Sequence, residues 1–105
     1  MAALAEFELL VLLAVVHCGE HAYSVAVHEE LERRSRRRAS MGAVYVTLER
    51  LEGKGFLTSR LGEPTPERGG RAKRFFTPTR AGRAALKEEC GVIRRMWAGL
   101  GLVPE

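Results

Sequence analysis

The chain has 105 residues, a hydrophobic content of 46%, and 17 basic against 13 acidic residues, for a net charge of +4 at pH 7. This length allows one small domain with a marginal core, which a partner subunit would help to stabilise, and it excludes a multidomain architecture. The longest apolar run, residues 9–16, is far shorter than a membrane span, and Glu6 and Glu8 stand where a signal peptide would be basic, so we expect a cytoplasmic protein without a membrane partner.

The first predicted helix covers about residues 4–18. Its residues 9–16 are apolar all round, so the helix must be covered on every side. One face can pack on its own domain, which leaves another for a second subunit, and Leu9 and Leu13 are our candidates for that contact. Gly19 ends the helix.

The second predicted helix runs from near Ala22 to Arg34. Its apolar stripe consists of Tyr23, Val27 and Leu31, which recur at intervals of four residues. The basic run at residues 33–38 follows it. That run is either a solvated helix end favoured by the helix dipole or a phosphate contact, and both roles can hold.

The third predicted helix, residues 40–55, has the clearest start signal, with Ser40 as its N-cap. Its core stripe is Val44, Leu48 and Leu51. The opposite face is small and smooth near the start of the helix, so the backbone could come close to the floor of a DNA groove. The candidate DNA contacts on this helix are Ser40, Gly42, Ala43, Tyr45, Val46, Thr47 and Arg50.

Residues 56–61 and 71–77 are predicted strands of a hairpin, joined by a loop at residues 62–70 whose two prolines forbid regular pairing. Gly69 and Gly70 permit the turn. The cations Arg71, Lys73 and Arg74 follow it, and we predict that they contact phosphates. Alternation along the strand places Arg71 and Lys73 on one face and Arg74 on the other.

The last predicted helix begins at the cap Thr79. Its apolar residues are spaced by 4, 3, 4 and 3, which is the alternation of a coiled-coil seam, but for only about two heptads. The seam consists of Leu86, Cys90, Ile93, Trp97 and Leu100. Gly91 and Gly99 weaken the helix, so it should be stable only when packed. We therefore predict a homodimer built from this helix and the helix at about 4–18.

A capped helix followed by a basic hairpin predicts a winged helix-turn-helix. The expected fold class is mainly α with a small β-hairpin (α+β). Residues 1–78 would form the DNA-binding domain and residues 79–105 the C-terminal dimerisation helix. Double-stranded DNA is the expected partner.

Enzymatic and metal chemistry have little support. The sequence has no phosphate-binding glycine loop, no paired carboxylates in an apolar setting and no assembled Ser–His–Asp set, so we expect no enzyme and no cofactor. The candidate zinc ligands are His17, Cys18, His21 and His28. Gly19 breaks the helical spacing between His17 and His21, so we expect no metal site. Cys18 and Cys90 suit reduced, buried thiols, with a redox-sensing pair as the alternative.

Four short segments, taken together and in their order along the chain, indicate a known family. Residues 21–23 read His-Ala-Tyr, residues 42–55 form a Gly-Ala-Val-Tyr-Val-Thr-Leu block ending in Gly-Lys-Gly, residues 69–76 read Gly-Gly-Arg-Ala-Lys-Arg-Phe-Phe, and residues 79–82 read Thr-Arg-Ala-Gly. Together they resemble the PadR family of bacterial winged-helix transcriptional regulators. The resemblance spans most of residues 21–83.

The resemblance implies a dimeric transcriptional regulator. We expect a repressor that binds an inverted-repeat operator, and an effector that releases this repressor from the DNA. The resemblance also implies that Tyr23 and Tyr45 approach the DNA backbone, although Tyr23 equally fits a packing role. Val46 replaces a usual proline on the side predicted to face the groove, so operator preference should differ. Phe75–Phe76 replaces a usual tyrosine pair, which removes hydroxyl contacts with phosphate or sugar. Some compact members bind flat hydrophobic drugs at an interface aromatic, and Trp97 is the candidate for a small hydrophobic effector. The alternatives are a protein-binding winged helix and a small-molecule sensor centred on Trp97.

Overall fold

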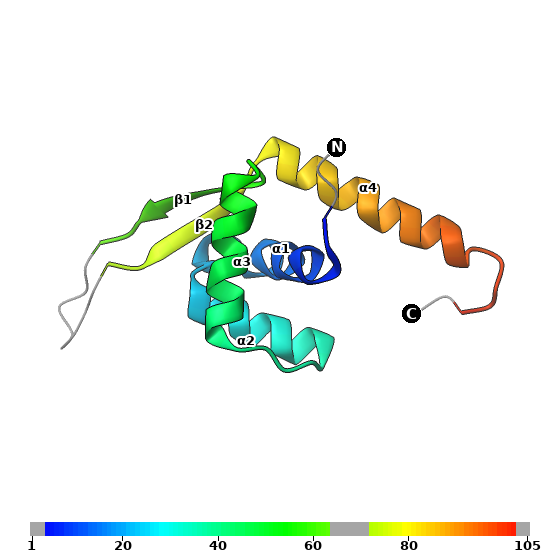
Figure 1. Cartoon of the computed structure of the whole chain (residues 1–105), viewed down its shortest axis with the longest axis horizontal. Helices are drawn as coiled ribbons and strands as arrows, with labels where there is room; N and C mark the ends of the chain where they lie inside the picture. The colour runs from blue at the N-terminus through cyan, green and yellow to red at the C-terminus, as the bar shows by residue number, and fades with distance from the viewer. Residues whose placement is uncertain (1–3, 64–71, 103–105) are drawn as a thin grey trace.

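The computed structural model describes residues 4–63 and 72–102. Within these residues the fold is α+β, as expected: four helices and a two-stranded antiparallel hairpin that projects from one side of them (Figure 1). The elements in chain order are α1 (Glu6–Cys18), the 3-10 turn η1 (Gly19–His21), α2 (Ser24–Ser35), α3 (Met41–Gly53), β1 (Leu57–Leu61), β2 (Arg74–Pro78) and α4 (Arg80–Trp97). No helix among the described residues is long and apolar enough to cross a membrane.

Helix α1 is the centre of the core. It packs against α2, α3, β2 and α4, and Val11, Leu12 and Val15 have no exposed surface (Figure 1). The expectation that an all-apolar helix must be covered is confirmed for these residues. Helix α1 ends as expected, because Gly19 takes a positive φ of 60°.

Helices α2 and α3 pack against α1 and against each other, and both contribute buried residues to the core. Their buried stripes are Val27 and Leu31 on α2 and Val44, Leu48 and Leu51 on α3, as their periodicity predicts. Tyr23 does not belong to the α2 stripe, because it is the extended N-cap residue before the helix.

The hairpin pairs Leu57 with Pro78 and Leu61 with Arg74. Phe76 of β2 is buried, and its N–H donates to the carbonyl of Ala22 at 2.8 Å, which joins the hairpin to the start of α2. Strand β2 begins at Arg74, so the described residues Ala72 and Lys73 of the predicted strand precede it, although the Lys73 carbonyl still accepts from the Gly62 N–H at 2.7 Å. The predicted turn and Arg71 lie outside the described residues.

Helix α4 starts in close contact with the hairpin and then projects away from it (Figure 1). The Thr79 hydroxyl accepts from the Gly82 N–H at 3.0 Å and donates to the Gly55 carbonyl at 2.6 Å, so the predicted cap is confirmed. Helix α4 ends at Trp97, which corrects the prediction that Leu100 continues the helical seam. Gly99 and Gly101 adopt positive φ and turn the chain instead.

Glu8 is a buried acid in the otherwise apolar α1. Its carboxylate accepts from Lys54 Nζ at 2.7 Å, at the end of α3, and from the backbone N–H of Ala5 at 2.9 Å, at the start of α1. Burial raises the pKa of Glu8, but the bond from Lys54, the bond from Ala5 and the charge of Arg50 together hold that pKa below its ordinary value of 4.5. Glu8 therefore joins α1 to the end of α3.

Replacing Glu8 with glutamine should lower the free energy of unfolding at pH 7 by about 2 kcal/mol, because the ammonium group of Lys54 loses its charged acceptor. Since the folded pKa is depressed, the contribution of Glu8 is complete above the ordinary pKa of 4.5 and is lost as the pH falls below it. Urea unfolding of both proteins between pH 7 and pH 3 should show the difference narrowing in acid. A difference in the free energy of unfolding that stays constant from pH 7 to pH 3 would contradict the stabilising role of the ionised Glu8 carboxylate.

Candidate nucleic-acid interface

The start of α3 is built by the Ser40 cap. The Ser40 hydroxyl accepts from the Ala43 N–H at 3.0 Å, as the sequence predicts. With Val44, Leu48 and Leu51 in the core, the opposite face of the helix is left to solvent. Its exposed residues are Met41, Gly42, Ala43, Tyr45, Val46, Glu49 and Arg50.

Thr47 does not join this exposed face. Its exposed fraction is 4%, because a rotation of 100° per residue places it next to Leu51, at the edge of the core stripe. The prediction that Thr47 donates to a phosphate is therefore corrected: its hydroxyl lies inside the domain. The exposed positions of the other candidates on α3 agree with the predicted geometry.

The residue before the cap is held by two side chains of α2. Ala39 donates its N–H to Glu32 Oε2 at 2.8 Å, and its carbonyl lies 2.7 Å from His28 Nε2. His28 and Glu32 are one turn apart, with 3.5 Å between Nε2 and Oε2. Both backbone groups of Ala39 are therefore satisfied, which fixes where α3 begins. Sequence reasoning considered His28 only as a metal ligand.

Two cations of the hairpin enclose two stacked aromatic rings, one from the hairpin and one from the residue that precedes α2. Lys73 Nζ lies 4.4 Å from the centre of the Tyr23 ring, that ring lies 5.7 Å from the Phe75 ring, and Arg60 Cζ lies 4.9 Å from the Phe75 ring. Each cation is attracted to the ring face that it covers. These contacts orient Lys73. They also show that Tyr23 packs against Lys73 and Phe75, which agrees with the predicted packing role of Tyr23.

Arg74 is held on the side of the hairpin that faces α3. Its Nη1 donates to Ser59 Oγ at 2.9 Å, and the Ser59 hydroxyl donates to Glu52 Oε2 at 2.8 Å. This chain of bonds connects the hairpin to α3. Lys73 and Arg74 thus have different neighbours, as strand alternation predicts, although both side chains remain exposed.

A groove of about 520 Å³ lies between the hairpin, the start of α2 and Tyr45 of α3. Its lining residues are Tyr23, Ser24, Val25, Tyr45, Leu61, Ala72, Lys73, Arg74 and Phe76. The cations Lys73 and Arg74 form one wall and Tyr45 belongs to the other. This groove therefore brings together the predicted hairpin contacts and one predicted α3 contact, with positive charge on one side. Arg50 lies on α3 but does not line it.

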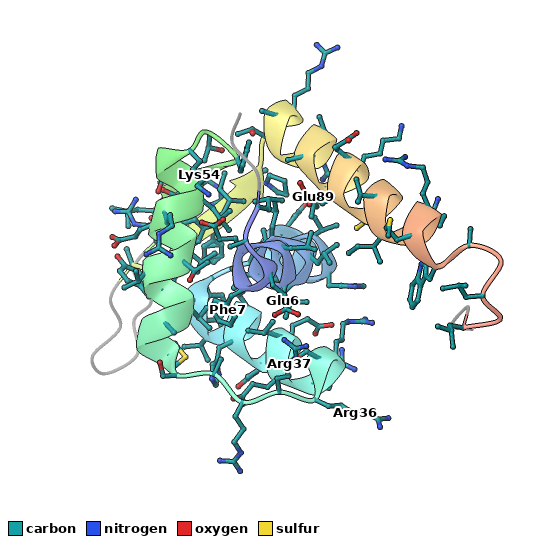
Figure 2. The ribbon with its side chains drawn as sticks, turned by 45° about the vertical axis from the view of Figure 1, so that its right-hand side comes forward. Glu6, Phe7, Arg36, Arg37, Lys54 and Glu89 are labelled. Atoms are coloured by element: carbon teal, nitrogen blue, oxygen red, sulfur yellow. The ribbon has the colours of Figure 1, made fainter. Side chains whose placement is uncertain are left out.

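Three of the five arginines in the basic run at residues 33–38 form ion pairs on the protein surface. Glu30 bonds to both Arg33 and Arg34, and these bonds lower its pKa. Arg37 Nη2 lies 3.2 Å from Glu6 Oε2, and Figure 2 shows Arg37 turned toward Glu6 while Arg36 points into solvent. These pairings favour the solvated helix end over a cluster of available cations.

The predicted dimer contacts divide into two groups. Leu9 and Leu86 are buried in their own domain, so they leave almost no surface for a partner, which corrects their assignment. Leu13, Cys90 and Trp97 are half-buried, and Ile93 is 46% and Leu100 62% exposed. Sequence reasoning missed Val92 and Met96, which are exposed on α4. The far half of α4 stands away from the domain (Figure 2).

The cysteines and histidines do not form a ligand set in the part of the chain that the structure describes. No group of three or more histidine, cysteine or acidic side chains there could hold a metal ion. Cys18 and Cys90 are both free and half-buried. Burial, together with the charge of Glu30, raises the pKa of the Cys18 thiol, which disfavours the reactive thiolate.

Comparisons with known proteins identify a family by its sequence model and a shared fold by solved structures. A model of the transcriptional regulator PadR-like family matches residues 12–88. A search of curated proteins found no match. Among solved structures, a PadR-like transcription factor from Bacteroides fragilis is 21% identical with a TM-score of 0.72, covering 86% of this chain and 82% of that one.

Two further structures show the same likeness. A PadR family transcriptional regulator from Eggerthella lenta is 23% identical with a TM-score of 0.70, covering 88% of this chain and 78% of that one. The winged-helix DNA-binding protein F93 from STIV is 19% identical with a TM-score of 0.66, covering 87% and 90%. At such identities the structures show a shared fold.

Proposed function

Because the chain belongs to the transcriptional regulator PadR-like family, whose model matches residues 12–88, we propose that it is a dimeric repressor of an inverted-repeat operator. In this proposal residues 1–78 bind DNA and residues 79–105 hold the dimer together. Helix α3 of each subunit enters a major groove, and the hairpin grips the flanking phosphates.

The groove between α3 and the hairpin is the observation that carries this proposal. It places Lys73 and Arg74 on one side of an exposed helix whose outward face is small. Positive charge beside such a helix complements a phosphate backbone beside a major groove. The proposed phosphate contacts are Ser40, Tyr45, Arg50, Lys73 and Arg74, with Arg71 as an expectation outside the described residues. Tyr23 supports Lys73 by stacking.

The dimer is proposed from the uncovered half of α4. The stripe that packs on the domain at Leu86 continues through Cys90 to Ile93 and Trp97, beyond the reach of the domain. Ile93 and Met96 expose apolar surface there, which a second α4 would cover. The half-buried Leu13 of α1 is the remaining α1 candidate for this contact.

An effector would act at the same interface. Trp97 is half-buried at the end of α4, where the two subunits would meet. A flat hydrophobic molecule that inserts there would change the angle between the DNA-binding domains and so lower operator affinity. Trp97 is the single tryptophan of the chain, so its fluorescence quenching by such molecules reports binding directly.

Replacing both Lys73 and Arg74 with alanine should weaken DNA binding at physiological salt more than tenfold, for any sequence. The slope of log affinity against log salt should become shallower by about 0.9 for each phosphate that the protein no longer neutralises. Fluorescence anisotropy with a labelled duplex measures both quantities. The matched control removes two exposed cations of α4, Lys87→Ala with Arg95→Ala, and should leave the slope nearly unchanged. Equal slopes in the hairpin variant and the wild type would reject the phosphate role and favour a protein partner.

A further inference from the structure

The first half of the outward face of α3 offers apolar groups rather than hydrogen-bonding groups. Among residues 41–46 the exposed side chains are Met41, Ala43, Tyr45 and Val46, and only Tyr45 is polar. Val46 is 50% exposed and Tyr45 40%. The Ser40 hydroxyl already accepts a bond from the helix backbone. Few side chains in this region can therefore read a base by hydrogen bonds.

The major-groove edges of the bases differ in the groups that they present. All four carry hydrogen-bonding atoms, but only thymine adds an apolar group, its C5-methyl. Recognition helices contact base edges mainly with their N-terminal residues. An exposed valine in that part of α3 therefore makes a favourable apolar contact with a base chiefly when that base carries a methyl group.

We propose that Val46, with Ala43 beside it, selects thymine by packing against the C5-methyl group. This inference rests on the proposed function, since it assumes that α3 enters the major groove. Operators of this protein should therefore hold at least one thymine in each half-site opposite Val46, and the protein should prefer it over uracil, which lacks only the methyl.

Gly42 supports a close approach of α3 to the groove floor. A Cβ placed on Gly42 would meet nothing within 4 Å, so the fold itself does not require glycine there. Glycine removes the side chain that would otherwise stand one turn before Val46 on the same face. The short side chains of Ala43 and Val46 can then reach a base edge.

The positive charges beside the apolar face of α3 favour duplex DNA over an apolar protein as the molecule that binds there. Lys73 and Arg74 line the groove between α3 and the hairpin, and both are exposed. In duplex DNA the phosphates lie beside the base edges. Cations that lie beside a small apolar patch can therefore pair with phosphates while the patch contacts a base edge. An apolar protein helix would leave both cations without a counter-charge.

The test begins with selection of duplexes from a library with a random core of about 20 base pairs. Each thymine of the selected duplex is then replaced singly by uracil, and affinity is measured by anisotropy. In each half-site, one replacement should weaken binding about fourfold, the effect of one buried methyl group. Replacement outside the selected core should have no effect.

Variants of Val46 link the effect to this residue. The exposed position of Val46 means that Val46→Ala should keep the wild-type unfolding temperature. It should lose most of the thymine preference, while Val46→Thr, which keeps one methyl, should retain part of it. Uracil replacements that all leave affinity unchanged, or a preference that persists in Val46→Ala, would overturn the inference but not the proposed function. A library that yields no enriched duplex would overturn the proposed function and this inference with it.

Discussion

Replacing Gly82 with alanine should destabilise the protein by at least about 3 kcal/mol, since overpacking against rigid backbone leaves no room for relaxation. A Cβ at Gly82 would lie 2.1 Å from the Phe56 carbonyl oxygen and 3.2 Å from its Cα. The same oxygen accepts a hydrogen bond from the Thr79 N–H at 3.0 Å. The alanine must therefore push α4 away from the start of the hairpin. Thermal unfolding should show a fall of more than about 12 °C.

The control for Gly82 is another helical glycine with free space. A Cβ at Gly53, in the last turn of α3, would meet nothing within 4 Å, and Gly53 has no positive φ. Gly53→Ala should therefore leave stability unchanged or raise it by up to about 1 kcal/mol. Similar unfolding temperatures for Gly82→Ala and wild type would show that α4 does not pack on Phe56 in this way.

Replacing Ile93 and Met96 together with glutamine should convert the proposed dimer to a monomer without unfolding the domain. Ile93 is 46% and Met96 75% exposed in the single chain, so neither is needed by the core of its own subunit. Polar side chains there remove the apolar surface that a second α4 would cover. Because a monomer engages only one half-site, operator affinity should fall on the order of a hundredfold or more.

Sedimentation velocity and anisotropy measure these two effects. Glutamine keeps the net charge, so a change in affinity does not arise from weaker electrostatic attraction to DNA. The control is Glu88→Gln with Arg95→Gln, an exposed pair on the other side of α4 that also leaves the net charge unchanged. It should remain dimeric. A dimeric Ile93/Met96 variant would place the subunit contact elsewhere on the molecule.

Local patterns predicted the helices and the hairpin of this fold, although not the start of β2 or the end of α4. The Ser40 cap and the spacing of Val44, Leu48 and Leu51 depend on neighbours within two turns of one helix, and both are predictable. The same periodicity also places Thr47 inside, although its hydroxyl alone suggests a phosphate donor. Gly99 similarly signals the end of α4 before Leu100, although the heptad spacing continues through it.

Contacts between distant parts of the chain were not predictable in the same way. Periodicity shows that Leu9 and Leu86 are buried, but not whether their own domain or a partner covers them. Tyr23 stacks on Phe75 because the Ala22 carbonyl bonds to β2, more than fifty residues away. The Glu8–Lys54 pair has one sequence signal, an acid within an apolar helix, and nothing in the sequence names its partner.

The most direct test of the central claim is anisotropy of the protein with labelled duplex from upstream of its own coding sequence. A scrambled duplex of the same composition is the control, and both are titrated at low and physiological salt. We expect binding to the upstream duplex that survives physiological salt while binding to the scrambled duplex disappears. No binding to either duplex at low salt would contradict the assignment of α3 and the hairpin as a DNA-binding surface.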